Sequence, residues 1–335
     1  MNQTILTGHP GDGVSCLAFS PSSSSELLVS SWDSTTRLYD PLQNFSKATY
    51  NFSGACLACC FNKNNGSSGF CGGLDAQVSA LDLSRGTASA RTGLGQHRKA
   101  VSCLDYAAED NILVSGSWDS SVSFWDPRGA TGSSGSSLIQ NVVTPGKVYS
   151  ISVTGQRVVV ATSERHILVY DVRNLNQVVQ ERESPLRHQT RKVACSIDGR
   201  FFAVGSTEGR VAIEYFDSDP EVQARKYAFK CHRVQQSAYP VNAIAFHPEY
   251  GTFATGGSDG AVNVWDGENK KRLAQLPAYP NSISSLAFNY NGTVLAVASS
   301  YVFEDGKMKD PSSLEQDNVY LRFVDEAEVR PRAKA

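Results

Sequence analysis

A repeat of about 44 residues runs through this chain of 335 residues and limits the folds open to it. The segment LLVSSWDSTTRLYD (27–40) recurs as ILVSGSWDSSVSFWD (112–126) and as FATGGSDGAVNVWD (253–266). Weaker copies lie at 68–82, 158–171 and 201–217, and the Asp residues that end the six copies are 42, 44, 45, 46 and 49 residues apart. A period of this length indicates one supersecondary unit repeated along the chain.

Each copy consists of short apolar runs separated by turn residues. A further run precedes each copy, as in VSCLAFS (14–20), and a seventh copy extends from ISSLAFN (283–289) to NVYLRFV (318–324). Runs rich in Val, Ile, Phe and Ser between Gly, Ser and Asp turns are typical of strands, and no long segment has the apolar period of a helix. The sequence therefore predicts an all-β fold, a seven-bladed WD-repeat β-propeller that forms a single domain.

The repeat also predicts the blade boundaries and the way the ring closes. The blades are expected at roughly 9–45, 50–90, 96–130, 144–178, 188–220, 238–272 and 280–326. The segment QTILTG (3–8) precedes the first copy, while the seventh copy is last in the chain. A strand at 3–8 that completes the last blade would cover an otherwise open sheet edge.

Composition excludes several classes of protein. The net charge of −2 provides no overall basic field, so no direct nucleic-acid partner is expected. The chain contains no run of 18 apolar residues, so no membrane helix is predicted. Its first residues lack the apolar core of a secretory signal. Eight cysteines in a chain of this length do not indicate a disulfide scaffold, and free thiols buried in a reducing compartment are expected instead.

The cysteine-rich segment CLACC (56–60) does not have the spacing of a metal site. Strand alternation would place Cys56, Ala58 and Cys60 on one face and Cys59 on the other, in a packed core. His9 and His97 each stand just ahead of an inner strand, where propeller repeats place a histidine that hydrogen-bonds within its blade. We therefore predict no metal and no cofactor.

No catalytic constellation is visible in the sequence. It contains no phosphate-binding P-loop, no dinucleotide-binding fingerprint and no nucleophile elbow. The Asp residues that recur once per repeat indicate architecture rather than acid–base chemistry. The chain is therefore predicted not to be an enzyme, and the alternative from another class is a hydrolase or isomerase built on a propeller.

The four tryptophans divide into two pairs. Trp125 and Trp265 end strands and are expected to be structural, whereas Trp32 and Trp118 lie in Ser-Trp-Asp turns. An indole at the rim of a turn stays partly exposed and is a candidate anchor for a partner peptide. The alternative is that each ring only covers its own turn.

The stretch KYAFKCHR (226–233) contains two lysines, one arginine and one histidine in eight residues. Alternation places Lys226 and Lys230 on one face of a strand and Tyr227 and Phe229 on the other. We expect Arg210 on a neighbouring strand, so that Arg210 and Lys230 converge at one rim. Two converging cations favour an anion, and phosphate fits best; the alternative is a solvated basic face.

Several segments together resemble one known family. STEGRVAIEYFDSDPEVQARKYAFKCHR (206–233), QERESPLRHQTR (180–191) and FATGGSDGAVNVWD are similar to the Bub-type ("budding uninhibited by benzimidazole") spindle-assembly checkpoint WD-repeat proteins, and the resemblance covers nearly the whole chain. The alternative is the nuclear-pore mRNA-export propeller, which shares SPLRHQ, EGRVAI and FKCHR and binds a nucleoporin GLEBS motif.

The resemblance implies two peptide-binding activities. The first holds the GLEBS segment of a checkpoint kinase or of its pseudokinase-like relative, through Arg191, Trp32 and Trp118. The second reads phosphothreonine in the MELT repeats of a kinetochore scaffold, through Arg210 and Lys230. The family also implies a location in the nucleus and, in mitosis, at the kinetochores of chromosomes. Neither the insertion at 302–317 nor the basic tail RPRAKA changes this assignment.

Overall fold

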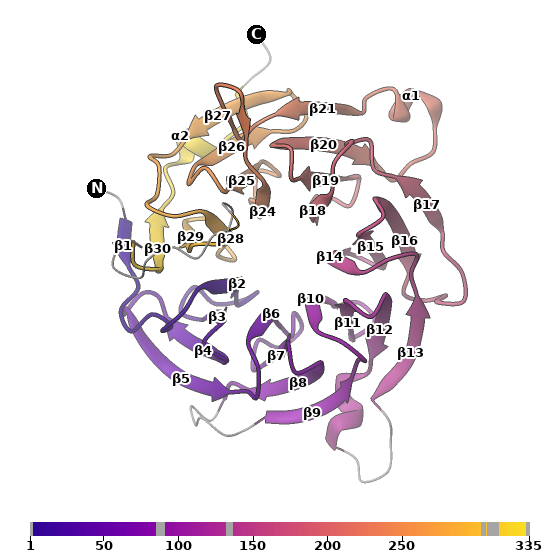
Figure 1. Cartoon of the computed structure of the whole chain (residues 1–335), viewed down its shortest axis with the longest axis vertical. Helices are drawn as coiled ribbons and strands as arrows, with labels where there is room; N and C mark the ends of the chain where they lie inside the picture. Colours follow the sequence, from indigo (N-terminus) through magenta and orange to yellow (C-terminus); the bar gives the residue numbers. More distant parts are fainter. Residues whose placement is uncertain (1–2, 85–90, 132–136, 303–305, 307–314, 333–335) are drawn as a thin grey trace.

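Seven four-stranded antiparallel sheets stand around a central axis in the computed structural model, which describes residues 3–84, 91–131, 137–302, 306 and 315–332 (Figure 1). The predicted all-β, seven-bladed propeller is therefore confirmed. From the axis outward, the strands are β2 (Val14–Phe19), β3 (Leu27–Ser31), β4 (Thr35–Asp40) and β5 (Phe45–Asn51); β6 (Cys56–Phe61), β7 (Ser68–Gly73), β8 (Gln77–Asp82) and β9 (Arg91–Gln96); β10 (Val101–Ala107), β11 (Ile112–Ser117), β12 (Ser121–Trp125) and β13 (Leu138–Val143); β14 (Val148–Thr154), β15 (Arg157–Thr162), β16 (His166–Asp171) and β17 (Gln180–Glu183); β18 (Thr190–Cys195), β19 (Phe201–Ser206), β20 (Arg210–Tyr215) and β21 (Tyr227–Lys230); β24 (Val241–Phe246), β25 (Phe253–Gly257), β26 (Val262–Asp266) and β27 (Lys271–Gln275); β28 (Ile283–Phe288), β29 (Val294–Ser299), β30 (Asn318–Phe323) and β1 (Gln3–Ile5).

The remaining elements are short. A two-residue hairpin, β22 (Arg233–Val234) and β23 (Ser237–Ala238), lies between the fifth and sixth blades. The helical turns are η1 (Pro127–Thr131), α1 (Pro220–Gln223) and α2 (Glu326–Val329). None of the helices in the described residues has the length and apolar character needed to span a bilayer.

The core lies between neighbouring blades. One apolar cluster joins Val159 and Val169 of the fourth blade to Phe202 and Val204 of the fifth, and all four side chains are buried. The second strands are buried along their whole length, as in β3, or at every residue but the first, as in β15, whereas an outer strand such as β21 alternates between half-buried and exposed residues. A blade therefore buries its faces only against its neighbours.

Pairing of β1 with β30 closes the ring. Gln3, Thr4 and Ile5 lie opposite Arg322, Leu321 and Tyr320, and the Leu6 N–H donates to the Val319 carbonyl over 2.8 Å. The predicted completion of the last blade by the start of the chain is thus what the structure shows. Leu6 is fully buried in a cluster that joins the last blade to the first.

The outer strands lie wholly or mostly beyond the ends that the repeat predicts for the first six blades. In the first blade, for example, β5 (45–51) pairs with β4, although the predicted boundary falls at 45; in the fifth, β21 (227–230) lies past the boundary at 220. The strong sequence pattern stops at the Asp that ends the third strand. A loop of variable length then leads to an outer strand with one solvated face, which has a weaker apolar signal.

A β-bulge interrupts each of the seven inner strands at the same place. The extra residues are 15, 57, 102, 149, 191, 242 and 284. A bulge inserts one residue and so reverses the alternation of the residues that follow. For this reason the predicted grouping of Cys56 with Ala58 and Cys60 is wrong: Cys56 packs with Cys59 in one cluster, and Ala58 packs with Cys60 in another.

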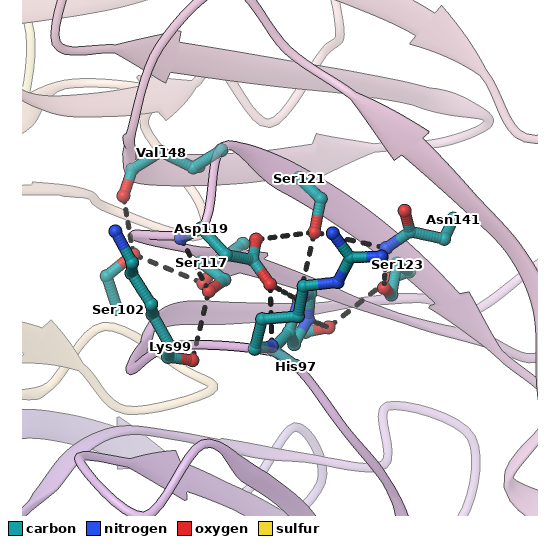
Figure 2. Close-up of polar contacts among 12 residues, drawn as sticks. His97, Lys99, Ser102, Ser117, Asp119, Ser121, Ser123, Asn141 and Val148 are labelled. Atoms are coloured by element: carbon teal, nitrogen blue, oxygen red, sulfur yellow. Dashed lines mark hydrogen bonds and ion pairs between the residues drawn. The ribbon is translucent and has the colours of Figure 1, made fainter.

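His97 has the structural role that the sequence predicts. Its Nδ1 lies 3.3 Å from Asp119 and 3.1 Å from Ser121, and its Nε2 lies 2.7 Å from Ser115 (Figure 2). The Trp125 indole donates to the same Ser115 hydroxyl over 2.7 Å. This network connects the loop before the third blade to two of its strands, β11 and β12, and to the turn between them.

His9 does not have the same role. Its Nδ1 lies 2.9 Å from the Pro10 carbonyl and its Nε2 lies near Gln316. The third strand of this blade has Tyr39 where the third blade has Trp125, and the Tyr39 hydroxyl donates to the Gly8 carbonyl over 2.6 Å. The first blade therefore attaches its entering loop through Tyr39 rather than through His9.

Truncation of Leu6 tests the closure of the ring. Leu6→Ala removes a fully buried side chain from the junction between the last and first blades, and we expect it to lower the free energy of unfolding by about 2–5 kcal/mol. Ile5, its neighbour, is 47% exposed, so Ile5→Ala is the matched control and should change stability by less than about 1 kcal/mol. Urea unfolding followed by tryptophan fluorescence measures both. Equal effects would contradict a closing role for Leu6.

A second test uses the pH dependence of stability. Burial lowers the pKa of His97 below its ordinary value of 6.5, and Asp119 opposes this only in part. The folded state therefore keeps the imidazole neutral while the unfolded chain takes up a proton, so stability is lost as the pH falls below about 6.5. In His97→Gln, the free energy of unfolding should fall less between about pH 7.5 and about pH 5.5 than in the unmodified protein. An unchanged slope would show that His97 does not contribute.

Candidate peptide-binding face

The predicted site residues all lie at one end of the ring, which we call the turn face. It comprises the turns between second and third strands (32–34, 74–76, 118–120, 163–165, 207–209 and 258–261) and the loops that lead into the inner strands. Trp32 and Trp118 lie in two of these turns. Arg210 follows another, Lys230 ends an outer strand, and Arg191 begins an inner strand.

The two turn tryptophans differ in exposure. Trp32 is 47% exposed, and its N–H donates to the Gly13 carbonyl over 2.9 Å. Trp118 is half-buried, and its N–H donates to the Ala100 carbonyl over 3.0 Å. Backbone bonds thus fix the position of both turns, and the Trp32 ring offers a large apolar surface to solvent.

Arg191 is the extra residue of the bulge in the fifth blade. Its Nε and Nη2 donate to the Asn242 Oδ1 over 3.3 and 3.2 Å, and Asn242, the bulge residue of the sixth blade, donates to the Ile283 carbonyl over 3.2 Å. Bulge residues of other blades also reach the next blade: Ser15 donates to the Cys56 carbonyl and Ser102 to the Val148 carbonyl. These bonds join neighbouring blades, and those to Asn242 hold the exposed Arg191 guanidinium in place.

Arg210 and Lys230 lie directly opposite each other on β20 and β21. Lys230 is exposed, as alternation predicts, while Tyr227 and Phe229 pack against the core of the fifth and sixth blades. The structure therefore brings together the two cations that the sequence places at one rim. Lys226, on the same face as Lys230, is held elsewhere, because its Nζ lies 2.7 Å from Glu214.

A third cation and one carboxylate complete this cluster. The Glu208 Oε2 lies 3.6 Å from Arg210 Nε and 3.7 Å from Arg233 Nη2, and the Glu208 carbonyl accepts from Arg233 Nε over 3.1 Å. Among the described residues no other carboxylate pairs with Arg210, Lys230 or Arg233, so the cluster has an excess of two positive charges. The Arg210 Nε–H is buried and has no acceptor there.

His232 fixes the backbone next to Lys230. It is fully buried, with Nδ1 2.9 Å from Asp259 and Nε2 2.9 Å from Thr255, to which the Trp265 indole also donates over 2.9 Å. This is the network of His97 repeated in the sixth blade. Sequence reasoning assigned His232 no role, because the hairpin β22–β23 separates it from its inner strand.

Gly209 allows the turn before Arg210 to approach this segment. Its φ is +65°, and a Cβ at this position would lie 2.2 Å from the His232 carbonyl. The Cys231 N–H donates to the Gly209 carbonyl over 3.0 Å. A glycine is therefore needed where Arg210 is placed beside Lys230.

Comparison with known proteins agrees with this architecture. The family model described as "WD domain, G-beta repeat" matches residues 2–40, 89–126, 224–266 and 270–309. The solved WD40 β-propeller domain of Doa1 superposes with a TM-score of 0.74 over 97% of each chain, at 18% identity, which shows the fold alone. The mitotic checkpoint protein BUB3.1 of Arabidopsis thaliana is 48% identical over 98% of this chain and 95% of its own length.

The chain belongs to the Bub3 family. A Schizosaccharomyces pombe poly(A)+ RNA export protein is more distant, at 35% identity over 97% of this chain and 91% of its own length. The names of the WD40 and Bub3 relatives point to a non-enzymatic scaffold. Within the described residues, no three His, Cys, Asp or Glu side chains are grouped so that they could hold a metal ion.

Sequence reasoning missed three members of the Bub3-family face. Glu208 and Arg233 flank the Arg210–Lys230 pair, and Asn242 supports Arg191. A signal for Arg233 was present, since it ends the basic stretch 226–233. The sequence contains no such signal for Asn242, because its contact with Arg191 depends on two bulges in neighbouring blades.

Proposed function

We propose that this chain is a mitotic checkpoint adaptor that binds two peptides on its turn face. One is a GLEBS segment of a checkpoint kinase or of its pseudokinase-like relative, and the other is a phosphorylated MELT repeat of a kinetochore scaffold. The names of the Bub3 relatives support the checkpoint role. The adaptor would then recruit the kinases to kinetochores, which places it in the nucleus and on mitotic chromosomes.

The juxtaposition of Arg210 and Lys230 carries the proposal. A phosphothreonine has a charge of roughly −1.5 to −2 and three strong acceptor oxygens. The cluster of Arg210, Lys230 and Arg233 has only Glu208 as a counter-ion, and its excess charge matches that of the phosphate. Lys230 is exposed and contacts no carboxylate among the described residues, so its ammonium is available to the phosphate.

The local nature of this charge makes recognition depend on the phosphate. The whole chain has a net charge of −2, so its overall field does not attract acidic peptides. An unphosphorylated threonine leaves the two excess positive charges of the cluster without a partner. Phosphorylation by a kinase elsewhere would therefore switch recruitment on.

The GLEBS segment is proposed to lie across the same face through Arg191, Trp32 and Trp118. Arg191 is exposed, positioned by Asn242 and paired with no carboxylate among the described residues, so a GLEBS glutamate would give it a charged partner. The exposed Trp32 ring supplies apolar contact of the kind found in binding hot spots. Because Arg191 and Arg210 lie in different strands of the fifth blade, the two peptides would meet different cations.

The S. pombe relative favours one alternative, an mRNA-export propeller that binds a nucleoporin GLEBS motif. Titration of the protein with GLEBS segments from a checkpoint kinase and from a nucleoporin separates the two. The checkpoint proposal requires tighter binding of the kinase segment.

Calorimetry with a MELT peptide in the presence of a GLEBS segment tests the phosphate site. We expect binding of the phosphorylated peptide and at least tenfold weaker binding of the unphosphorylated one, because about 1.5–3 kcal/mol is associated with each hydrogen bond to a charged group. Arg210→Ala or Lys230→Ala should each weaken the phosphopeptide by about ten- to a hundredfold. Lys271→Ala, which removes the same charge from the opposite end of the sixth blade, is the control.

Two outcomes would contradict this proposal. Equal affinity for both forms of the MELT peptide would exclude phosphate recognition. If Lys271→Ala weakened binding of the phosphopeptide as much as Lys230→Ala, the effect would be general electrostatic attraction and not recognition at this site.

Substitutions on the GLEBS surface should have the reverse effect: they should weaken the GLEBS segment and not the phosphopeptide. Arg191→Ala should weaken a GLEBS segment of the kinase by about tenfold or more while the protein retains its phosphopeptide affinity, since Arg191 lies outside the Arg210 cluster. Trp32→Glu and Trp118→Glu should also weaken the GLEBS segment. Fluorescence anisotropy with labelled peptides measures both affinities. If neither Trp variant has an effect, the rings only cover their own turns.

A further inference from the structure

Two cysteine thiols meet inside the ring, at the end opposite the turn face. The later residues of the inner strands line a cavity of about 380 Å³ there, and its walls include Cys16, Cys59, Asp105 and Lys192. Cys16 lies on β2 and is half-buried, whereas Cys59 lies on β6 and is buried. Figure 1 shows these two strands as neighbours at the axis.

The two side chains contact each other across the boundary between the first and second blades. The Cys16 sulfur lies 3.6 Å from the Cys59 carbonyl oxygen, and the Cys59 sulfur lies 3.8 Å from the Cys16 carbonyl oxygen. Both are free thiols.

The charges around the pair favour a thiolate on Cys16. The hydrogen bond from Cys59 and the nearby Lys192 ammonium lower the pKa of Cys16 to about 6, against the effects of burial and of Asp105. Asp105 is itself neutralised by Lys63, whose Nζ lies 2.7 Å from it. Contact with Cys16 and burial raise the pKa of Cys59, and burial raises that of Cys60.

We propose that Cys16 is a peroxide-reactive thiol and that Cys59 resolves its oxidised form into a disulfide between the first and second blades. The half-buried Cys16 lines the cavity, which gives a small hydroperoxide access to its sulfur. Cys59 is the adjacent residue across the blade boundary, since each of the two sulfurs lies within 3.8 Å of the other residue's carbonyl oxygen. The proposal is independent of the peptides bound on the turn face.

The chemistry proceeds in two balanced steps. The Cys16 thiolate attacks one oxygen of hydrogen peroxide, so that an S–O bond forms, the O–O bond breaks, and the departing hydroxide takes up a proton to become water. The Cys59 thiol then loses its proton and attacks the Cys16 sulfur; an S–S bond forms, the S–O bond breaks and a second water leaves. Two thiols are oxidised by two electrons in total, and the peroxide accepts them.

The third blade contains a matched control. Cys103 follows the bulge of β10 as Cys16 follows that of β2. Its cluster contains Ile151, which occupies in β14 the position of Cys59 in β6, so no second thiol faces it. Burial raises the pKa of Cys103 to about 11.

The experiment treats the full-length protein with hydrogen peroxide near neutral pH, blocks the remaining thiols with an alkylating reagent and identifies the peptides by mass spectrometry. We expect Cys16 to lose its free thiol at least about tenfold faster than Cys103, together with the appearance of a Cys16–Cys59 linked peptide pair that reductant separates. The rate at Cys16 should rise with pH and level off above about pH 7, because its pKa is about 6.

Variants and a chemical probe complete the test. In Cys59→Ser, Cys16 should accumulate as a sulfenic acid that a dimedone-type reagent captures, whereas Cys103→Ser should leave the Cys16–Cys59 disulfide unchanged. Oxidation of Cys16 no faster than that of Cys103 would overturn the proposal. Fast oxidation of Cys16 without a disulfide to Cys59 would overturn it as well. Both measurements use the unmodified protein, so they test the proposal even if a variant fails to fold.

Discussion

The pairing of β1 with β30 is the interaction on which the rest of the structure depends. Each four-stranded blade buries its faces only against its two neighbours, so an open ring would leave two apolar faces in water. The cluster that contains Leu6, Val14 and Val319 spans the junction between the last and first blades, as comparable clusters span other boundaries. A closed ring of this kind holds its surface loops in place before any ligand arrives, which lowers the ordering cost of binding.

The seven bulges add side chains that join neighbouring blades of this regular ring. Each adds one residue near the start of an inner strand, and several of these side chains form hydrogen bonds to the next blade. In the fifth blade the added residue is Arg191, so the repeat's own geometry presents a cation at the axis. The same shift in alternation brings Cys59 into the cluster against which Cys16 packs.

The sequence predicts most of what local patterns determine. The blade number, the closing strand and the neighbouring positions of Arg210 and Lys230 all follow from the repeat and from alternation within one hairpin. Features that depend on contacts between distant residues were not predictable in this way. His232 belongs to the sixth blade although it follows the last strand of the fifth, Cys56 changes face at a bulge, and Glu208 reaches Arg233 only because the chain turns back after β21.

The arrangement of the two proposed sites follows from the same architecture. The cations of β20 and β21 lie at the turn face of the fifth blade, whereas the thiols of β2 and β6 lie near the axis in the first and second blades (Figure 1). Because each blade contacts only its neighbours, a covalent link between two inner strands changes a single boundary of the ring. The fifth blade packs against the fourth and sixth, and the link forms at neither of these boundaries. The two proposed sites share one strand, because β18 contributes Arg191 to the turn face and the neighbouring Lys192 to the cavity that Cys16 lines.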